Sequence, residues 1–356
     1  MLRAMQEGEM RPYRVIQWAT GSVGRLAIRA IAEAPDLEIV GVWVHSASKI
    51  GKDAGELAGI DRLGVAATND ARALLALDAD CVCYAPLLSD VDEICRILAA
   101  GKNVVTPTGY VFLKDPAVAT RIDAACRAGG VSFHGSGIHP GFAGDRLPLV
   151  LSALSQRIDK ITVIEESDFA DIDESRAMVF DQLGFGMPAA EARRQPPALM
   201  GVMSTIFKES MQMIAAGLGF EIDGFATSHE PALATRDIDE AGGRILKDHV
   251  AGHHFEYKAL RRGKPIIEFQ TYWKMTNDIE PRWDYDAILR YTVLVEGRPS
   301  FRCVLEPFAG QDVPGLVWTA MNCVNAIPLV CAAEPGIRTP LDLPMITARP
   351  HAVRLP

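Results

Sequence analysis

The sequence has no excess of positive charge. Its 356 residues include 36 Lys and Arg against 45 Asp and Glu, which gives a formal net charge of −9. General binding to nucleic acid depends on clustered Lys and Arg, and no basic stripe with interleaved aromatic residues occurs. The composition therefore excludes a general polyanion binder, although a local anion pocket is compatible with any net charge. We expect no nucleic-acid partner.

Cysteine is present, but without the spacing that metal sites or disulfide scaffolds require. No pair has CxxC spacing, and most of the cysteines lie in apolar runs such as DCVCYAP, where a thiol behaves as a small hydrophobic group. The seven residues are Cys81, Cys83, Cys95, Cys126, Cys303, Cys323 and Cys331. We therefore predict no metal site, and a reduced, cytoplasmic protein.

Long hydrophobic runs are also missing. No stretch of about 18 uninterrupted apolar residues occurs, so no transmembrane span is expected. The first residues, MLRAMQEGEMRP, lack the apolar centre of a signal peptide. We expect no membrane partner.

What is present is the composition of an ordinary globular protein, with 49% hydrophobic and 23% charged residues. Apolar, β-branched runs alternate with helical patterns in the first 150 residues, as in YRVIQWA, LEIVGVWV and KNVVTPT. Continuous apolar strands separated by helices indicate a parallel sheet that is covered on both faces. We predict an α/β protein with a Rossmann-type, doubly wound domain over residues 13–145.

The pattern changes near residue 146. Helical stretches lead into strand-like ones such as HHFEYKALRRGKPIIEFQTYWKM, in which RRGK predicts a hairpin turn. We predict an α+β substrate and dimerisation domain over residues 146–312, with an open, mostly antiparallel sheet. Residues 313–356 are predicted to form a helix and tail that pack back on the first domain. A long sheet with exposed edges favours pairing of two chains, so we expect a homodimer.

The stretch ATGSVGR follows the first predicted strand and begins the first predicted helix. Compared with the dinucleotide fingerprint G-x-G-x-x-G, it has Gly21 where the backbone approaches the pyrophosphate and Gly24 where helix and sheet pack closely, and Ala19 replaces the first glycine. A helix starting here directs free N–H groups at phosphates. The alternative is a tight turn that binds nothing. The residues predicted to contact the cofactor here are Thr20, Gly21, Ser22, Val23 and Gly24.

The end of the second strand decides which dinucleotide is bound. It reads His45-Ser46-Ala47-Ser48-Lys49, without the carboxylate that accepts hydrogen bonds from ribose hydroxyls. His45, Ser46 and Lys49 would tolerate a 2′-phosphate, which favours NADP(H) over NAD(H). The alternative is that Lys49 is a solvated loop lysine. Further cofactor contacts are expected after the fourth and fifth strands, from Ala85, Pro86, Thr106 and Thr108.

Several motifs together resemble one family. They are ATGSVGR, KIGKDAGELAGI, GKNVVTPT, GSGIHPGFAGD and the ending PGIRTPLDLP. The chain resembles the dihydrodipicolinate reductase N-terminal superfamily, and within it the branch of 2,4-diaminopentanoate dehydrogenase and native amine dehydrogenases. The resemblance implies a nicotinamide-binding Rossmann domain, a mixed α/β substrate domain and a homodimer. Dihydrodipicolinate reductase activity is not expected, because carboxylates around Glu165 stand where that reductase carries paired histidines.

The resemblance also indicates candidates for proton transfer. Members of the branch carry a glutamate after the fifth strand, but Gly109 and Tyr110 occupy that position here. Tyr110 is a candidate proton donor or, alternatively, a lining residue. His139 stands where the branch has asparagine, so it either orients the nicotinamide or titrates. Glu165 is the third candidate.

Glu165 belongs to an acidic cluster with Glu166, Asp168 and Asp171. The cluster could hold an amine or position water, or it could be a solvated loop. His253 and His254 are adjacent in a predicted strand, where neighbouring side chains point to opposite faces, so the two cannot jointly bind a metal.

The function that these features favour is an NAD(P)H-dependent oxidoreductase acting on a small, fairly apolar carbonyl, imine or amine. A second possibility is amine dehydrogenation proper, with a non-standard acid or base. A third, of another class, is a nicotinamide-binding regulatory protein without turnover.

Overall fold

The computed structural model describes residues 11–170, 177–194, 197, 199–240, 243–309 and 313–353. The chain forms two compact units, and it passes from the first to the second after Gly137 and returns to the first after Gly315. The domain boundaries expected from the sequence, after residues 145 and 312, stay a prediction. The two units are described separately below.

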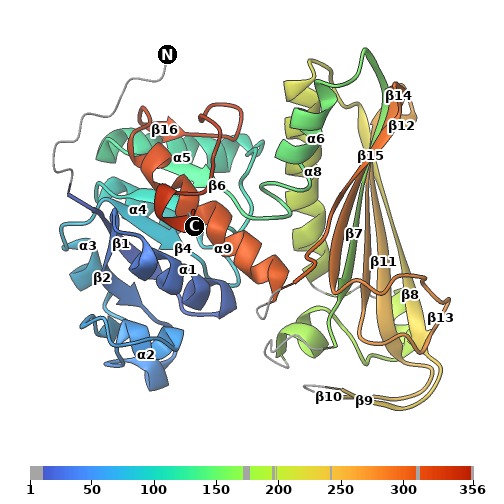
Figure 1. Cartoon of the computed structure of the whole chain (residues 1–356), viewed down its shortest axis with the longest axis horizontal. Coiled ribbons are helices and arrows are strands. Elements are labelled where there is room, and N and C mark those ends of the chain that lie inside the picture. The colour runs from blue at the N-terminus through green and yellow to red at the C-terminus, as the bar shows by residue number, and fades with distance from the viewer. Residues whose placement is uncertain are drawn as a thin grey trace. The chain divides into compact units, whose positions relative to one another are not determined.

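The first unit is built on a parallel sheet of seven strands in the order β16-β6-β5-β4-β1-β2-β3 (Figure 1). The strands are β1 (Tyr13–Trp18), β2 (Leu37–Trp43), β3 (Ala67–Thr68), β4 (Cys81–Tyr84), β5 (Asn103–Thr106), β6 (Ser132–Gly135) and β16 (Gly336–Ile337). The helices are α1 (Ser22–Glu33), α2 (Ala54–Ala58), α3 (Ala71–Leu75), α4 (Val91–Ala99), α5 (Pro116–Gly129) and α9 (Pro314–Cys331), with short 3-10 turns η1 (Ala47–Lys49) and η3 (Pro350–Ala352). The predicted Rossmann-type, doubly wound fold is confirmed.

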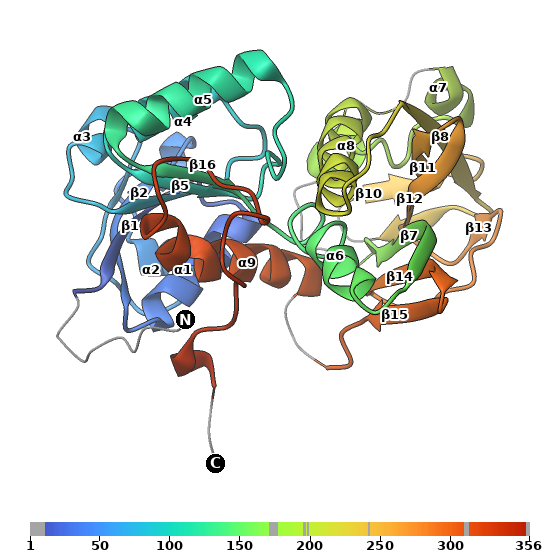
Figure 2. The same cartoon turned by 90° about the horizontal axis from the view of Figure 1, so that it is seen from above.

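Helices cover both faces of this sheet, which explains why its strands are apolar throughout (Figure 2). Ile28 of α1 and Ile327 of α9 are fully buried in the core on one face. Ile97 of α4 and Ile122 of α5 are fully buried in the core on the other. By length and composition alone, α9 is apolar enough to cross a membrane. Its buried side chains, however, contribute to the core that α1 shares.

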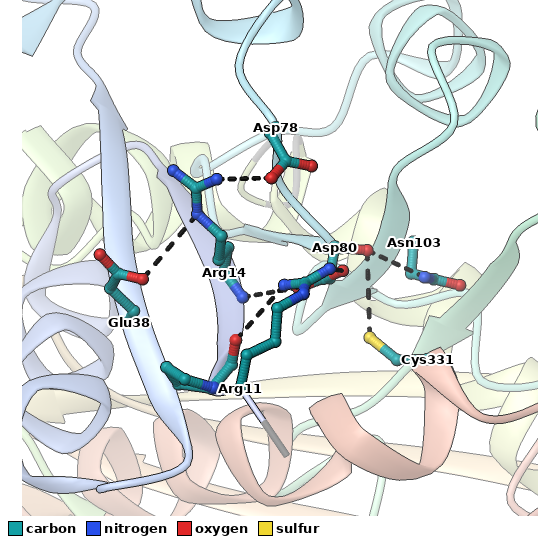
Figure 3. Close-up of polar contacts among 8 residues, drawn as sticks. Arg11, Arg14, Glu38, Asp78, Asp80, Asn103 and Cys331 are labelled. Atoms are coloured by element: carbon teal, nitrogen blue, oxygen red, sulfur yellow. Dashed lines mark hydrogen bonds and ion pairs between the residues drawn. The ribbon is translucent and has the colours of Figure 1, made fainter. Parts of the chain in front are cut away.

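Charged groups join the strands of this sheet at their amino-terminal ends (Figure 3). The Asp80 carboxylate accepts two hydrogen bonds of 2.8 Å from the Arg11 guanidinium and one of 2.7 Å from the Arg14 backbone N–H. Burial acts to raise the pKa of Asp80, but these hydrogen bonds and the nearby arginine charges outweigh it and lower that pKa. The backbone carbonyl of Asp80 accepts from Asn103 Nδ2 at 2.9 Å and from Cys331 Sγ at 3.9 Å. This edge is thus used for stability, and the carboxyl-terminal edge stays available for ligands.

The second unit contains a seven-stranded sheet in the order β13-β8-β11-β12-β7-β14-β15. The strands are β7 (Arg157–Asp168), β8 (Gly224–Ala234), β11 (Val250–Arg261), β12 (Lys264–Lys274), β13 (Ile279–Glu280), β14 (Leu289–Arg298) and β15 (Phe301–Leu305), and β9 (Ile238–Glu240) pairs with β10 (Gly243–Ile245) separately. The helices are α6 (Arg146–Ser152), α7 (Ala189–Arg194) and α8 (Leu199–Gly217), with a π-helical turn η2 (Ala177–Gln182). Only β12 and β7 pair in parallel within this sheet, so the mostly antiparallel prediction is confirmed.

The predicted hairpin turn is also present. Arg262 and Gly263 connect β11 to β12 with φ values of 51° and 70°, the left-handed pair that a two-residue hairpin loop needs. One face of the sheet packs against α8 (Figure 2). Phe207 and Met211 of that helix are fully buried together with Phe269 of β12. Side chains on that inner face contribute the second candidate region described below.

Candidate functional site

The turn after β1 has the backbone geometry of a phosphate-binding loop. Ala19 has a φ of 72°, a left-handed conformation that alanine rarely adopts, and it therefore takes the backbone role of the missing first glycine. A Cβ on Gly24 would lie 2.3 Å from the Ala19 carbonyl oxygen, so only glycine lets α1 pack this closely against the turn. A Cβ on Gly21 would meet nothing within 4 Å, which leaves space for a ligand against the backbone.

Helix α1 presents unpaired backbone donors to that space. Gly21 is its N-cap, and the first intrahelical bond runs from Arg25 N to Gly21 O at 2.9 Å. The N–H groups of Ser22, Val23 and Gly24 therefore lie outside the helical ladder. The first turn contains no acidic residue. This end of α1 fits the negative charge of a pyrophosphate.

Lys49 lies against the phosphate turn and is not a solvated loop residue. Its Nζ donates to the Thr20 carbonyl oxygen at 2.9 Å and contacts Thr20 Oγ1 at 3.2 Å. Burial lowers the pKa of Lys49, and the positive charges of Arg25 and Lys52 lower it further. Lys49 thus places a positive charge against the turn, within reach of the charges of Arg25 and Lys52, and such a group can hold an additional phosphate.

The neighbours of Lys49 complete the loop after β2. Ser46 Oγ and Ser48 Oγ are 2.8 Å apart, and the His45 ring lies edge-on to Trp43 with centroids 6.2 Å apart. His45 and Ser46 are both exposed. The structure therefore brings Thr20 and Lys49 together and leaves the His45 and Ser46 side chains accessible to a ligand.

The residues expected after β4 and β5 also lie at the carboxyl edge of the sheet. Ala85 N donates to Trp18 O at 2.9 Å, which continues the pairing of β4 with β1 as far as Ala85, and Pro86 is the next residue. Thr106 Oγ1 and Thr108 Oγ1 are 2.8 Å apart. In doubly wound sheets, ligands bind at this edge, near the point where the strand order reverses.

Tyr110 follows on the same loop as Thr108 and has a φ of 62°. Its hydroxyl lies 2.7 Å from Ser89 Oγ, in the loop after β4. Its ring meets Phe133 edge-on, with centroids 5.8 Å apart. Ser89 was not found by sequence reasoning, because the pair is separated by 21 positions and no motif links them.

In the second unit, His139 and Glu165 form a buried pair. His139 Nδ1 lies 2.6 Å from Glu165 Oε2, and the two side chains are 1% and 11% exposed. Glu165 Oε1 accepts a hydrogen bond of 3.1 Å from Trp273 Nε1. The His139 ring stacks on Phe207 at 4.4 Å. A Cβ on Gly144 would lie 2.2 Å from His139 Cδ2, so Gly144 makes the room for this ring.

The second ring nitrogen of His139, Nε2, differs from Nδ1 in its surroundings. Among the described residues, Nε2 has no hydrogen-bond partner although it is buried. Burial, and then the charge of Glu165, raise the pKa of Tyr257 and of Tyr291, whose rings are also in this region. Ionisation of these two phenols is therefore disfavoured, and Glu165 contacts His139 and Trp273.

The acidic cluster expected from the sequence is not one site. Strand alternation sends Glu165 to the inner face and Glu166 to the outer face, where its Oε2 accepts from Arg290 Nε at 2.5 Å. Asp168 Oδ1 accepts from Ala170 N at 2.9 Å, and Asp171 lies outside the described residues. The expectation that these carboxylates could hold an amine together is therefore wrong for Glu165 and Glu166.

His253 and His254 do point to opposite faces. His254 stacks on Tyr272 at 4.1 Å, whereas His253 points inward, with Nδ1 3.0 Å from His229 Nε2. Burial lowers the pKa of His253 to about 3 and that of His229 to about 4. This neutral pair was missed because His229 and His253 lie on different strands, and only the register of β8 with β11 brings them together.

Comparisons with known proteins agree with the two-part architecture. Residues 15–117 match the family model described as dihydrodipicolinate reductase, N-terminus. Residues 142–355 match the model described as 2,4-diaminopentanoate dehydrogenase C-terminal domain, which covers more than half of the chain.

Similar proteins with names and similar solved structures agree with these family matches. The chain is 33% identical to an amine dehydrogenase of Streptomyces virginiae, over 96% of this chain and 98% of the relative. It is 28% identical to a 2,4-diaminopentanoate dehydrogenase of Acetoanaerobium sticklandii, over 71% and 70% of the two chains. The amine dehydrogenase structure from Mycobacterium smegmatis has the same fold, with a TM-score of 0.78, 22% identity and coverage of 95% and 98%. The chain therefore belongs to the family of 2,4-diaminopentanoate dehydrogenases and amine dehydrogenases, and it is a nicotinamide-dependent oxidoreductase.

Proposed function

We propose that the protein transfers a hydride between NADP(H) and a small, fairly apolar amine, imine or carbonyl compound. The observation that carries the proposal is the phosphate turn, where Gly21 leaves open space beside the uncapped amino end of α1. The relatives named amine dehydrogenase and 2,4-diaminopentanoate dehydrogenase support a substrate in which the reacting carbon bears nitrogen.

In this proposal, the residues of the first unit bind the cofactor. The N–H groups of Ser22, Val23 and Gly24 receive the pyrophosphate, and His45, Ser46 and Lys49 receive the 2′-phosphate. Ala85, Pro86, Thr106 and Thr108 lie along the edge that the nicotinamide half would follow. The bound cofactor supplies or accepts the hydride, and the chain supplies binding, orientation and proton transfer.

The substrate class is argued from the loop after β4. Leu87 and Leu88 in this loop are 61% and 59% exposed, which is unusual for two adjacent leucines. An apolar substituent beside the reacting carbon would cover them. A strongly charged substrate gains nothing from such a surface, whereas an aliphatic or aromatic amine does.

We assign His139 and Glu165 a supporting role. The two side chains are 1% and 11% exposed, and the His139 ring packs against Gly144 and Phe207. A buried pair of this kind fixes the orientation of the segment that contains it. It holds the beginning of the second unit, near Ile138, against β7.

The test is an assay of the purified protein with NADPH and NADH. We expect NADPH oxidation with small apolar ketones in the presence of ammonia, and NADP⁺ reduction with the corresponding primary amines. Activity with ketones but without any dependence on ammonia would favour a carbonyl reductase. Tight nucleotide binding without turnover of any substrate would favour the regulatory alternative, and no nucleotide binding would disprove the proposal.

The homodimer remains part of this proposal. Ile164 of β7, Thr292 of β14 and Val304 of β15 are paired in register on the outer face of the second sheet, and Val304 is 48% exposed. Such a row suits face-to-face contact with a second copy. Light scattering should give the mass of a dimer, and Val304→Lys should give a monomer. All seven cysteines are free, in accordance with the cytoplasmic location that we propose.

A further inference from the structure

Tyr110 adopts a backbone conformation that tyrosine rarely adopts. Its φ is 62°, and the preceding Gly109 has a φ of 104°. Left-handed backbone is unfavourable for a bulky side chain, and it persists where the surrounding structure imposes it, most often at functional sites.

The surrounding structure does impose this conformation. A Cβ on Gly135, the last residue of β6, would lie 2.4 Å from Gly109 O and 2.5 Å from Tyr110 C and O. The backbone of residues 109–110 therefore lies directly against β6. The next residue, Val111, is fully buried, and the Tyr110 ring is held edge-on by Phe133.

This backbone conformation determines where the Tyr110 hydroxyl lies. Tyr110 Oη lies 2.7 Å from Ser89 Oγ, so two loops that follow adjacent parallel strands meet through their hydroxyl groups. The Ser89 loop is itself anchored, since Asp90 N donates to Tyr84 Oη at 3.1 Å and the Asp90 carboxylate caps α4. Both loops lie at the carboxyl edge of the sheet, where a doubly wound fold binds its ligand.

We propose that the Tyr110 hydroxyl is the catalytic acid and base, and that Ser89 positions it. This inference rests on the proposed function. In the reductive direction, the substrate carbon accepts a hydride with its two electrons from the reduced nicotinamide, which is oxidised. Tyr110 gives its proton to the substrate nitrogen or oxygen, so that C=X becomes CH–XH. Tyr110 then regains a proton from water, and Ser89 Oγ holds the phenolate oxygen by a hydrogen bond until it does.

The first test compares two tyrosines of the same unit. Tyr110→Phe should lower kcat by about 10²-fold or more, the usual contribution of a positioned acid or base, with KM and the affinity for NADPH unchanged. Tyr13→Phe is the matched control, because Tyr13 begins β1 at the opposite, amino-terminal edge of the same sheet. It should keep the wild-type kcat. An unchanged kcat in Tyr110→Phe would overturn the inference.

Ser89 is tested separately because its role is to position Tyr110. Ser89→Ala should lower kcat without changing KM, and Ser89→Thr should restore it, because threonine keeps the hydroxyl. In the Tyr110→Phe background, Ser89→Ala should have no further effect. Independent, additive losses would show that Ser89 acts elsewhere.

A readout without turnover completes the test. Tyrosine labelled with carbon-13 at Cζ gives one resonance for Tyr110, identified by its loss in Tyr110→Phe. Adding a ketone to the NADP⁺ complex, in which no hydride is available, should shift this resonance as the carbonyl oxygen approaches. A resonance that does not move, in an enzyme that oxidises NADPH, would overturn this inference alone. Absence of NADPH binding would overturn the proposed function first.

Discussion

The two units place their polar side chains in opposite ways. In the first unit, the candidate groups lie on loops at the carboxyl edge of a parallel sheet. Lys49 and Tyr110 are half-buried there, and each contacts a hydroxyl-bearing residue, Thr20 in the case of Lys49 and Ser89 in the case of Tyr110. In the second unit, Glu165 lies on the inner face of a sheet, where it meets His139 of the segment before α6 among aromatic rings.

This difference separates binding from support. Half-exposed groups on loops can exchange water for a ligand at little cost, whereas a buried pair loses stability when either partner changes. We therefore expect substitutions at the edge of the first sheet to change affinity or rate. Substitutions on the inner face of the second sheet should mainly change stability.

The largest effect on stability is expected from a substitution that breaks the buried pair of His139 and Glu165. Glu165→Leu leaves two buried donors, His139 Nδ1–H and Trp273 Nε1–H, without an acceptor. At roughly 1–3 kcal/mol for each unpaired group, the free energy of unfolding should fall by about 4 kcal/mol. Urea denaturation measures it.

The control is the adjacent residue. Glu166→Gln removes a partly exposed ion pair with Arg290, which should cost less than about 1 kcal/mol. If Glu165→Leu were as mild as Glu166→Gln while activity disappeared, Glu165 would be part of the reaction, and the separation of the two regions would fail.

The next largest effect is expected on the affinity for NADPH at the phosphate turn of the first unit. Gly21→Asp places a carboxylate where a Cβ meets nothing within 4 Å, so folding should be unaffected. The negative charge faces the expected pyrophosphate, and the dissociation constant for NADPH should rise about 100-fold, or about 2.7 kcal/mol. Calorimetric titration and thermal denaturation measure the two quantities.

Gly201→Asp is the control, because it makes the same substitution at a glycine of the second unit. It lies at an exposed position of α8 where a Cβ also meets nothing within 4 Å. It should leave nucleotide binding as it is. Equal NADPH affinity in Gly21→Asp and Gly201→Asp would mean that the turn binds no phosphate.

The first unit could be predicted well from sequence because its signals are local. A strand, a glycine turn and a helix follow one another within residues 13–33, and each has its own pattern. Even the departure at Ala19 did not disturb the prediction, since its φ of 72° reproduces the backbone that glycine would give. The contact between Tyr110 and Ser89 was not predictable, because it depends on two loops meeting in space.

The second unit shows where sequence reasoning stops. Its strands and the hairpin at Arg262 and Gly263 could be predicted from alternation and turn residues. Glu165 and Glu166 were grouped by their closeness in sequence, although a strand sends them to opposite faces. His229 was not considered, because its partner lies 24 positions away and strand register alone joins them.

The histidine pair allows a test by pH. The pKa of His253 is about 3 in the folded protein, against about 6.5 when unfolded. As the pH falls below about 6.5, the unfolded chain binds a proton that the folded chain does not, so stability decreases. Between pH 7 and pH 5 this residue should account for a loss of about 2 kcal/mol.

His253→Phe should flatten the stability profile over that interval. Phenylalanine suits the site, because Phe185 and Phe255 already surround the ring. Phe185→Leu changes the packing around the His253 ring but removes no titrating group, so it should leave the slope unchanged. Urea denaturation at each pH provides the data, and an unchanged slope in His253→Phe would mean that other groups cause the acid sensitivity.

The smallest effect concerns the choice of cofactor. Lys49→Gln removes one positive charge beside the phosphate turn. The affinity of this variant for NADPH should be about tenfold lower than that of the wild type, or about 1.4 kcal/mol. Affinity for NADH should stay the same, because NADH lacks the 2′-phosphate. Lys52→Gln, which removes an exposed charge 4.0 Å from Glu56, should lower the affinity for NADPH less than Lys49→Gln does.

If Lys49→Gln lowered the affinity for NADPH and for NADH equally, Lys49 would act through its hydrogen bonds to Thr20 and would order the turn for either cofactor. In that case Lys49 would be a supporting residue like Glu165, and the contrast between the two units would be one of degree.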